Sequence, residues 1–327
     1  MDLKKLEKVP KNYFKEILES LSKMEKLKRT PFFSGIHFTE AERELAQKIN
    51  NYRKIEKEAK KVWKIVELSR NENRPQCLDY INGIFEDFIQ LAGDRQTGDD
   101  KSIIAGLGRL AGTTVAVIGN NKGKDIKQRV EHNFGMGIPQ GYRKSQRIMK
   151  LADRFGFPII TFVDTPGAYP GLEAEDDGQA GAIAKSILTM FEVKVPIISV
   201  LIGEGGSGGA LALAVGNYVM MLKNATYSVI SPEGCAAILW KDPSGSKLAA
   251  RALKITSKDL IRLKIIDRII HEPLGGAQNN PERIVRIVKK YIIYALERYE
   301  NVPGEELKMQ RAKKYESMGI FSYTDKA

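Results

Sequence analysis

Five glycines within seven residues, from Gly203 to Gly209, follow directly on a short apolar run, Ile197–Ile202. That run is rich in β-branched residues and begins after a proline, which is typical of a fully buried strand in a parallel sheet. The small apolar residues that come next, Ala210–Val215, suit a buried helix. A strand, a glycine turn and a helix together present backbone N–H groups at a helix N-terminus, where the helix dipole favours negative charge. We therefore predict an oxyanion-binding site here, with tight strand–helix packing as the alternative.

A second strand with a glycine turn lies earlier in the chain. The strand IITFVDT begins after Pro158 and leads into Pro166, Gly167 and Ala168. Its Asp-Thr-Pro-Gly sequence matches the magnesium-side motif of a GTPase, but no phosphate-binding GxxxxGK[ST] loop lies upstream, so we reject that interpretation. If the two strands are neighbours in one sheet, the N–H groups of both turns converge on one oxygen atom.

The glycine turn around Ser207 also satisfies the G-x-S-x-G pattern of a hydrolase nucleophile elbow. A triad would need a histidine downstream of the serine, and His271 with Asp259 or Asp267 is the available combination. Flanking glycines produce this pattern in any glycine-rich turn. The backbone oxyanion site is therefore the preferred interpretation.

The sequence offers little for metal binding. Its two cysteines, Cys77 and Cys235, form neither a disulfide framework nor a zinc knuckle. An acidic run from Glu173 to Asp177 opens a predicted helix, where carboxylates complement the helix dipole. We interpret the run in that way and predict no metal in this chain.

Strands alternate with helices along the middle of the chain, which indicates an α/β fold with a mainly parallel sheet. Residues 1–72 read as helical, and Pro75 marks the boundary to this region. Predicted helices cover Asn12–Lys28, Thr39–Leu68, Leu78–Gln90, Tyr142–Phe155, Gln179–Phe191, the segment CAAILW, 246–264, a helix with Asn280 as N-cap, and 304–317; predicted strands cover both sides of Gly112, IITFVDT, Ile197–Ile202, a segment after Asn217, and Asp267–Ile270.

The formal net charge is +12, and much of it lies in the N-terminal helices, for example at Lys54, Lys57 and Lys60. A solvated helix face explains this pattern, and attraction of a polyanion or an acidic partner is the alternative. Nucleic-acid binding is not expected, because no recognition motif is present. The chain has no apolar run of the ~20 residues that a membrane span needs, and no signal or transit peptide. These features predict that the protein stays in the compartment where it is made.

Several long motifs of the chain resemble a known family. They are FVDTPGAYPGLEAEDDGQAGAIA, IGEGGSGGALAL and TYSVISPEGCAAILWKD, joined by LDYINGIFEDFIQLAGDR, HNFGMGIPQGYRKSQRIMKLADRFGFP and IIHEPLGGAQNNP. In this order, over residues 75–282, they resemble the α subunit of the bacterial and plastid acetyl-CoA carboxylase carboxyltransferase. Where that family usually has His-Gln-Lys-Gly, this chain has Asn120-Asn121-Lys122-Gly123, which keeps the basic loop but changes the first two side chains.

The resemblance implies a crotonase/ClpP-like fold, a spiral of ββα units. It divides the chain into a helical N-terminal region, 1–74, a carboxyltransferase core, 75–280, and C-terminal helices with a tail, 281–327. It also implies an activity, which is transfer of the carboxyl group of carboxybiotin, delivered on biotin carboxyl carrier protein, to acetyl-CoA. The product is malonyl-CoA, in the first committed step of fatty acid biosynthesis.

The resemblance further implies a set of partners. Two copies of a carboxyltransferase β subunit would join two copies of this chain in an α2β2 heterotetramer, with active sites at the α/β interface. Zinc is expected in the β subunit, and biotin carboxylase belongs to the full ATP-dependent complex. Such a complex resides in the bacterial cytoplasm or the plastid stroma.

The glycine turns and the resemblance together define a predicted site. The N–H groups of Gly208 and Gly209 hold the biotin oxyanion, and Gly167 and Ala168 form the facing loop. The predicted substrate-binding residues are Gly205, Gly206, Ser207, Lys122, Lys124, Arg143 and Lys144, the four basic ones as contacts of CoA phosphates or alternatively as solvated surface charges.

Two other classes of function stay open at this point. A single-chain acyl-CoA hydratase, isomerase or decarboxylase of the same fold would act without a second subunit. A scaffold that binds nucleic acid or membrane through its basic N-terminal helices would show steeply salt-sensitive binding.

Overall fold

The computed structural model describes residues 19, 22–23, 26 and 39–319. The chain divides into two compact units, one formed by Met1–Lys64 with Ile230–Lys254 and the other by Ile65–Val229 with Ile255–Ala327. Residues 230–254 thus belong to the first unit, and the C-terminal helices belong to the second. The predicted helix over Asn12–Lys28 lies largely outside the described residues.

The first unit is helical in its described part. The predicted long helix is confirmed as α3 (Thr39–Ser69), whose last residues, from Ile65, belong to the second unit. Arg251 donates to the carboxylate of Glu58 on α3 at 2.8 Å. A small apolar cluster includes Cys235, Ala236 and Trp240. The remaining elements of this unit are α10 (Pro232–Trp240), which confirms the predicted CAAILW helix, η2 (Pro243–Gly245) and α11 (Ser246–Leu253).

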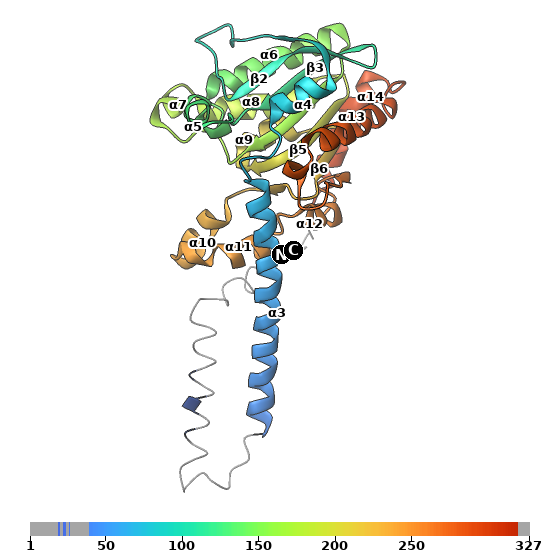
Figure 1. The fold of residues 1–327 in the computed structure, drawn as a ribbon. Helices are drawn as coiled ribbons and strands as arrows, with labels where there is room; N and C mark the ends of the chain where they lie inside the picture. Colours follow the sequence, from blue (N-terminus) through green and yellow to red (C-terminus); the bar gives the residue numbers. More distant parts are fainter. Residues whose placement is uncertain (1–18, 20–21, 24–25, 27–38, 320–327) are drawn as a thin grey trace, which may run out of the picture. The chain divides into compact units, whose positions relative to one another are not determined.

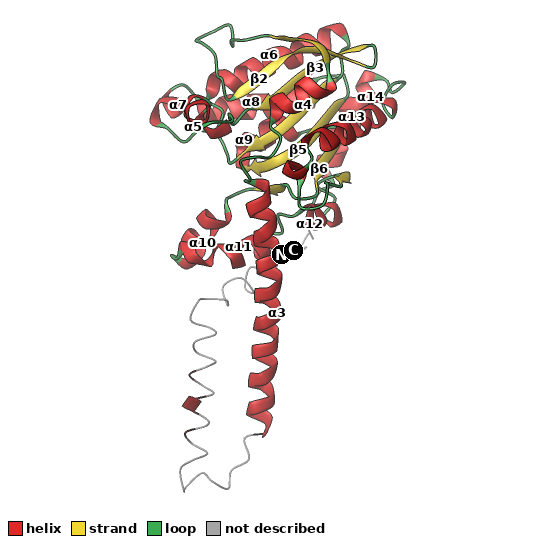
Figure 2. Cartoon of the chain, in the orientation of Figure 1, coloured by secondary structure: helices red, strands yellow, loops and turns green. Residues whose placement is uncertain are grey.

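The described strands of the second unit form one eight-stranded sheet (Figure 2). Its order is β1-β2-β3-β4-β5-β6-β8, and β7 pairs with the end of β5. The first three strands are antiparallel neighbours and the others run parallel. The bounds are β1 (Glu86–Gln90), β2 (Ile103–Leu110), β3 (Thr113–Asn120), β4 (Ile159–Thr165), β5 (Ile197–Gly206), β6 (Tyr218–Leu222), β7 (Thr226–Ser228) and β8 (Arg268–Ile270).

Helices cover both faces of this sheet, because its central strands are apolar on both sides. Every residue of β4 is buried, as are the first seven of β5. Runs of this kind need a helix layer above and below. On one face lie α4 (Cys77–Ile84) and α13 (Pro281–Glu297), and on the other α6 (Pro139–Phe155), α8 (Gln179–Glu192) and α9 (Ser207–Ala214) (Figure 1).

The predicted helix over Leu78–Gln90 is wrong in its second half. The helix α4 ends at Ile84, and the chain continues as edge strand β1, paired with β2. The spacing of Phe85 and Phe88 suits a helix, but Phe88 packs against Gly106 of β2, where a Cβ atom would lie 2.8 Å from its ring. A long-range contact thus decides the local structure, and the periodicity of the segment does not reveal it.

Most other predicted elements are confirmed. The helix α13 begins at Pro281, and the side chain of its N-cap Asn280 accepts from the N–H of Arg283. Arg311 of the C-terminal helix is fully buried and donates to the carbonyls of Val193 and Val195, both at 3.0 Å. Along the described part of the chain, no helix combines the length and apolarity needed to cross a membrane. The helices not yet named are α5 (Ile126–Glu131), η1 (Asn133–Gly135), α7 (Leu172–Asp176), α12 (Ser257–Arg262), η3 (Ala277–Asn279) and α14 (Gly304–Glu316).

Candidate active site

The two glycine turns lie side by side. Strands β4 and β5 are parallel neighbours, and Thr165 at the end of β4 pairs with Gly205 near the end of β5. The carboxyl ends of parallel strands meet at one edge of a sheet, which is where α/β proteins place their ligands. The condition set by the sequence, that the two strands be neighbours, is met.

The turn after β5 leads directly into a helix with unpaired N–H groups. The N-cap of α9 is Gly206, which has no side chain with which to cap the helix. The next three residues, Ser207, Gly208 and Gly209, are the first of the helix, and their N–H groups have no partner within it. The start of α9 therefore offers donors and the positive end of the helix dipole to an anion.

Glycine is required at two positions of this turn, because the two loops touch through their backbones. A Cβ atom on Gly206 would lie 2.0 Å from the carbonyl oxygen of Pro166. A Cβ atom on Gly209 would lie 2.6 Å from the nitrogen of Ala168. At Gly208 the nearest atom would be a side-chain methyl carbon of Ile183 at 3.4 Å. Glycine is thus obligatory for the contact at 206 and 209, and not at 208.

Ser207 adopts a left-handed backbone conformation, with φ of 50°. This conformation is rare for a residue with a side chain, and it often marks functional sites. The sharp turn has the shape of a nucleophile elbow, but the predicted triad partners are engaged elsewhere. Asp267 accepts from the N–H of Val219 at 2.7 Å, and Asp259 accepts from Arg262 at 2.6 Å.

In the turn after β4, a backbone N–H group is already bonded within the turn. The hydroxyl of Thr165 accepts from the N–H of Gly167 at 3.1 Å and donates to the carbonyl of the same residue at 2.6 Å. The next residue but one, Tyr169, donates its N–H to Gly137 at 3.0 Å. Gly167 therefore shapes the loop, whereas Ala168 presents its backbone to Gly209.

A charged cluster lies beneath the two turns, at the ends of β3, β4 and β5. Lys122 contacts Asp164 at 2.7 Å and Glu204 at 2.9 Å. Glu204 also accepts from Arg70 at 2.7 Å, and its N–H donates to Asp164 at 2.9 Å. A cavity of about 270 Å³ opens beside these four side chains and Pro166. Asp164, Glu204 and Arg70 were not among the predicted site residues, although the two acids lie at strand ends, where folds of this kind place ligands.

The pKa values of Lys122 and Glu204 are both shifted toward the charged form. Burial alone would raise the pKa of Glu204, but Lys122 and Arg70 outweigh it, so this pKa is lowered. Burial likewise opposes the charge of Lys122, but Asp164 and Glu204 outweigh it, so its pKa is raised. The cluster is a fixed network at neutral pH, and it ties the three strand ends together.

The other predicted basic residues do not gather with Lys122. Lys124 pairs with Asp79, and its side chain is 62% exposed. Arg143 donates to Asp94 and Asp177 at 2.9 and 2.7 Å. Lys144 is only 1% exposed and is bonded to the carboxylate of Asp99 and the carbonyl of Asp100. The two residues of α6 therefore tie down the loop 93–100 in this structure, and of the three only Lys124 presents its ammonium group to solvent.

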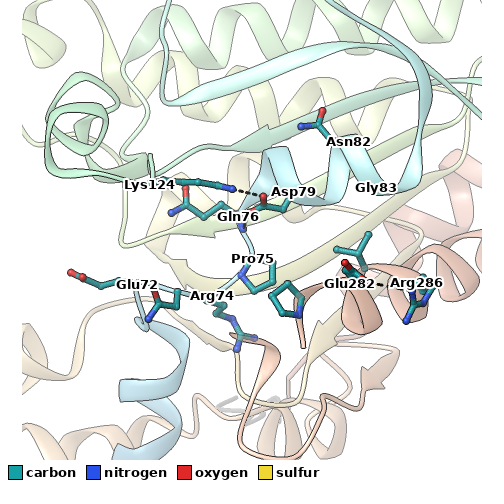
Figure 3. A pocket seen from close by; sticks show the side chains of 13 residues that line it. Glu72, Arg74, Pro75, Gln76, Asp79, Asn82, Gly83, Lys124, Glu282 and Arg286 are labelled. Carbon is teal, nitrogen blue, oxygen red and sulfur yellow. Dashed lines mark hydrogen bonds and ion pairs between the residues drawn. The ribbon is translucent and has the colours of Figure 1, made fainter. Parts of the chain in front are cut away.

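A second cavity, of about 650 Å³, lies between the start of α4 and the start of α13 (Figure 3). Ion pairs within its lining join Lys124 to Asp79 and Glu282 to Arg286. Arg74 at its base forms a bidentate pair with Glu272 at 2.8 and 2.9 Å. Its charges are matched within the protein, and neither glycine turn lines it, so we place the reaction at the turns.

Two solved structures have a similar fold. The transcarboxylase 12S structure with methylmalonyl-coenzyme A and methylmalonic acid bound matches with a TM-score of 0.57 and 18% identity, over 78% of this chain and 44% of that chain. The Pseudomonas malonate decarboxylase hetero-tetramer, in complex with coenzyme A, matches with a TM-score of 0.58 and 18% identity, over 74% and 96%. The predicted crotonase-type fold is confirmed.

The sequence comparison is more specific. Residues 11–319 match the family described as acetyl co-enzyme A carboxylase carboxyltransferase-like. The acetyl-coenzyme A carboxylase carboxyl transferase subunit alpha of Thermus thermophilus is 47% identical over 314 residues, which is 96% of this chain and 99% of that protein. The protein of the same name from Xanthomonas axonopodis is 51% identical over 259 residues, covering 79% and 81%. The chain belongs to this carboxyltransferase family.

Proposed function

We propose that this chain is the α half of a carboxyltransferase that makes malonyl-CoA from acetyl-CoA and carboxybiotin. The observation that carries the proposal is the contact between the turns after β4 and β5, in which Gly209 at the start of α9 packs against the backbone of Gly167 and Ala168. The match spans 99% of the Thermus relative, so the proposal draws on that protein over its whole length.

The start of α9 suits a carbonyl oxygen that gains negative charge. The missing Cβ atoms at positions 206 and 209 let the two turns touch, and the helix begins at this contact without a side-chain cap. A urea-type carbonyl oxygen, such as that of biotin, becomes more negative as the carboxyl group leaves. Donors aimed at a developing negative charge stabilise the transition state more than the ground state.

Carboxybiotin supplies the carboxyl group by cleavage of its N–C bond, and the freed ring nitrogen takes the proton from the methyl carbon of acetyl-CoA, where the new C–C bond forms. This chain contributes through its backbone. The N–H groups of Gly208 and Gly209 bind the ureido carbonyl oxygen, and the loop of Gly167 and Ala168 lies opposite them. No side chain of the turns is required as a nucleophile.

The charged cluster serves as a positioning device in this scheme. Asp164 bonds to the main chain of Glu204, two residues before the N-cap of α9, and Lys122 joins both carboxylates. These bonds fix the distance between the ends of β4 and β5. They therefore also fix the start of α9 relative to the turn after β4.

The proposal includes partners. A zinc-bearing β subunit would complete the acetyl-CoA site in an α2β2 heterotetramer, a carrier protein would deliver carboxybiotin, and biotin carboxylase would recharge it. Relatives that are named as a subunit support this, as does the hetero-tetrameric malonate decarboxylase. Of the basic residues, Lys124 is the proposed contact of a CoA phosphate because its side chain is exposed. Bacterial cytoplasm or plastid stroma remains the proposed location.

The test is formation of malonyl-CoA from free carboxybiotin and acetyl-CoA. The full chain is assayed alone and mixed with a candidate β subunit. The proposal predicts activity only in the mixture. Activity of the chain alone would instead support a self-sufficient acyl-CoA enzyme, and no activity with any β subunit would contradict the proposal.

A further inference from the structure

A third pocket lies on the second unit, between the edge strand β8 and the middle of α13. Its volume is about 490 Å³, within the range of small-molecule sites. Ile287, Lys290, Tyr291 and Tyr294 come from α13, at positions that share one face of the helix. Arg268 and His271 come from β8 and the residue that follows it. None of the six belongs to the glycine turns or the charged cluster.

Cationic and aromatic groups dominate this pocket, and no carboxylate lines it. The two acids that flank its basic residues in the sequence are held elsewhere. Asp267 is bonded to the N–H of Val219 and to Lys314, and Glu272 forms the bidentate pair with Arg74. The positive charge of Arg268 and Lys290 is therefore unmatched within the lining.

The aromatic side chains are arranged for stacking. The guanidinium carbon of Arg268 lies 5.3 Å from the ring centroid of Tyr291. One turn further along α13, the Tyr294 side chain is 49% exposed, so its ring is available to a ligand. Cations that bind phosphate next to exposed rings that stack on a planar base are the chemistry of nucleotide recognition.

We propose that this pocket binds a nucleotide, with its phosphates on Arg268 and Lys290 and its base against Tyr294. An inorganic anion alone would not use the tyrosine rings, and an apolar ligand would not use the cations. The proposal does not rest on the carboxyltransferase activity, because it is tested by binding.

The experiment measures binding of N-methylanthraniloyl-ADP to the full chain by fluorescence anisotropy. We expect saturable binding that ADP displaces more effectively than tripolyphosphate or adenosine. The double variant Arg268→Ala/Lys290→Ala should raise Kd about 10- to 100-fold, since charge-assisted hydrogen bonds are lost. Tyr294→Leu should raise Kd for the nucleotide by at least about fivefold and leave tripolyphosphate binding unchanged.

A matched control removes the same amount of charge from α13 outside the pocket. Arg283 and Arg286 are exposed residues of α13 outside this pocket, so Arg283→Ala/Arg286→Ala should change Kd less than about twofold. An equal loss in both double variants would overturn the proposal, because binding would then be non-specific. So would absence of saturable binding, or an unchanged Kd in Tyr294→Leu. Displacement by coenzyme A at lower concentration than ADP would also overturn it, since the pocket would then belong to the substrate.

Discussion

The turns after β4 and β5 look alike in the sequence and differ in what they offer a ligand. Each follows a buried parallel strand, contains glycine and precedes a helix. In the first turn the hydroxyl of Thr165 takes up the N–H of Gly167. In the second turn the N-cap is a glycine, so no side chain caps the first N–H groups of α9. The first turn therefore only bounds the site, whereas the second offers hydrogen-bond donors.

The comparison also separates two roles of glycine. At Gly206 and Gly209 the missing Cβ atom lets the backbones of the two turns touch, whereas Gly208 has ordinary surroundings. Glycine-rich composition alone does not distinguish these positions. The following predictions test the difference between the turns.

The largest effect is expected at the contact between the turns. Gly209→Ala places a Cβ atom 2.6 Å from the nitrogen of Ala168, so one of the loops must move. We expect the rate of malonyl-CoA formation, with the β subunit present, to fall at least about 100-fold, as when an oxyanion donor is lost. Gly208→Ala is the control, with a loss below about fivefold. Equal rates in the two variants would show that the contact does not matter.

The next effect concerns the cluster that joins the strand ends. Lys122→Met leaves Asp164 and Glu204 without their shared cation in a buried place. Breaking such a pair costs about 3–5 kcal/mol, which urea unfolding measures. The control is Lys124→Met, two residues further along the chain. It breaks an exposed ion pair and should cost less than about 1 kcal/mol. The account fails here if both variants lose the same stability.

A pH dependence follows from Glu204. Its pKa in the folded protein is lower than the ordinary value of 4.5, because Lys122 and Arg70 outweigh the effect of burial. Its stabilisation is present above the ordinary value and is lost as the pH falls through the lowered one. The free energy of unfolding of the unaltered protein should therefore exceed that of the Glu204→Gln variant by about 1.5–3 kcal/mol at neutral pH. That difference should shrink below pH 4.5, and a difference independent of pH would contradict the assignment.

The smallest effect is expected in the turn after β4. Thr165→Val keeps the shape of the side chain but leaves the N–H of Gly167 without its acceptor. We expect a lower kcat/KM, equivalent to a loss of about 0.5–1.5 kcal/mol of transition-state stabilisation. Thr165→Ser retains the hydroxyl and should restore the rate. A rise in rate in the valine variant would mean that Gly167 is a second donor.

Most of the fold could be predicted from the sequence, since the apolar runs Ile197–Ile202 and IITFVDT specify buried parallel strands on their own. The strand β1 could not, because the spacing of Phe85 and Phe88 is helical and only the partner β2 decides otherwise. The placement of residues 230–254 in the first unit is a long-range property of the same kind.

The meeting of the two glycine turns could be predicted from the sequence, whereas the charged cluster beside them could not. Glycine composition points to the turns directly, but nothing local indicates that Lys122, Asp164 and Glu204 meet, because they come from three different strand ends. The sequence does not indicate the left-handed conformation of Ser207 either, since it depends on how the turn packs against Pro166.

The central claim is that the N–H groups at the start of α9, and not that of Gly167, stabilise the negative charge. The most direct measurement replaces Gly208, Gly209 and Gly167 in turn by glycolic acid in the full chain, which exchanges one N–H for an oxygen. The rate of malonyl-CoA formation with the β subunit should fall about 10²- to 10³-fold for position 208 or 209. It should fall less than about tenfold for position 167, whose N–H is already bonded to Thr165. Unchanged rates at 208 and 209, or an equal loss at 167, would contradict the account.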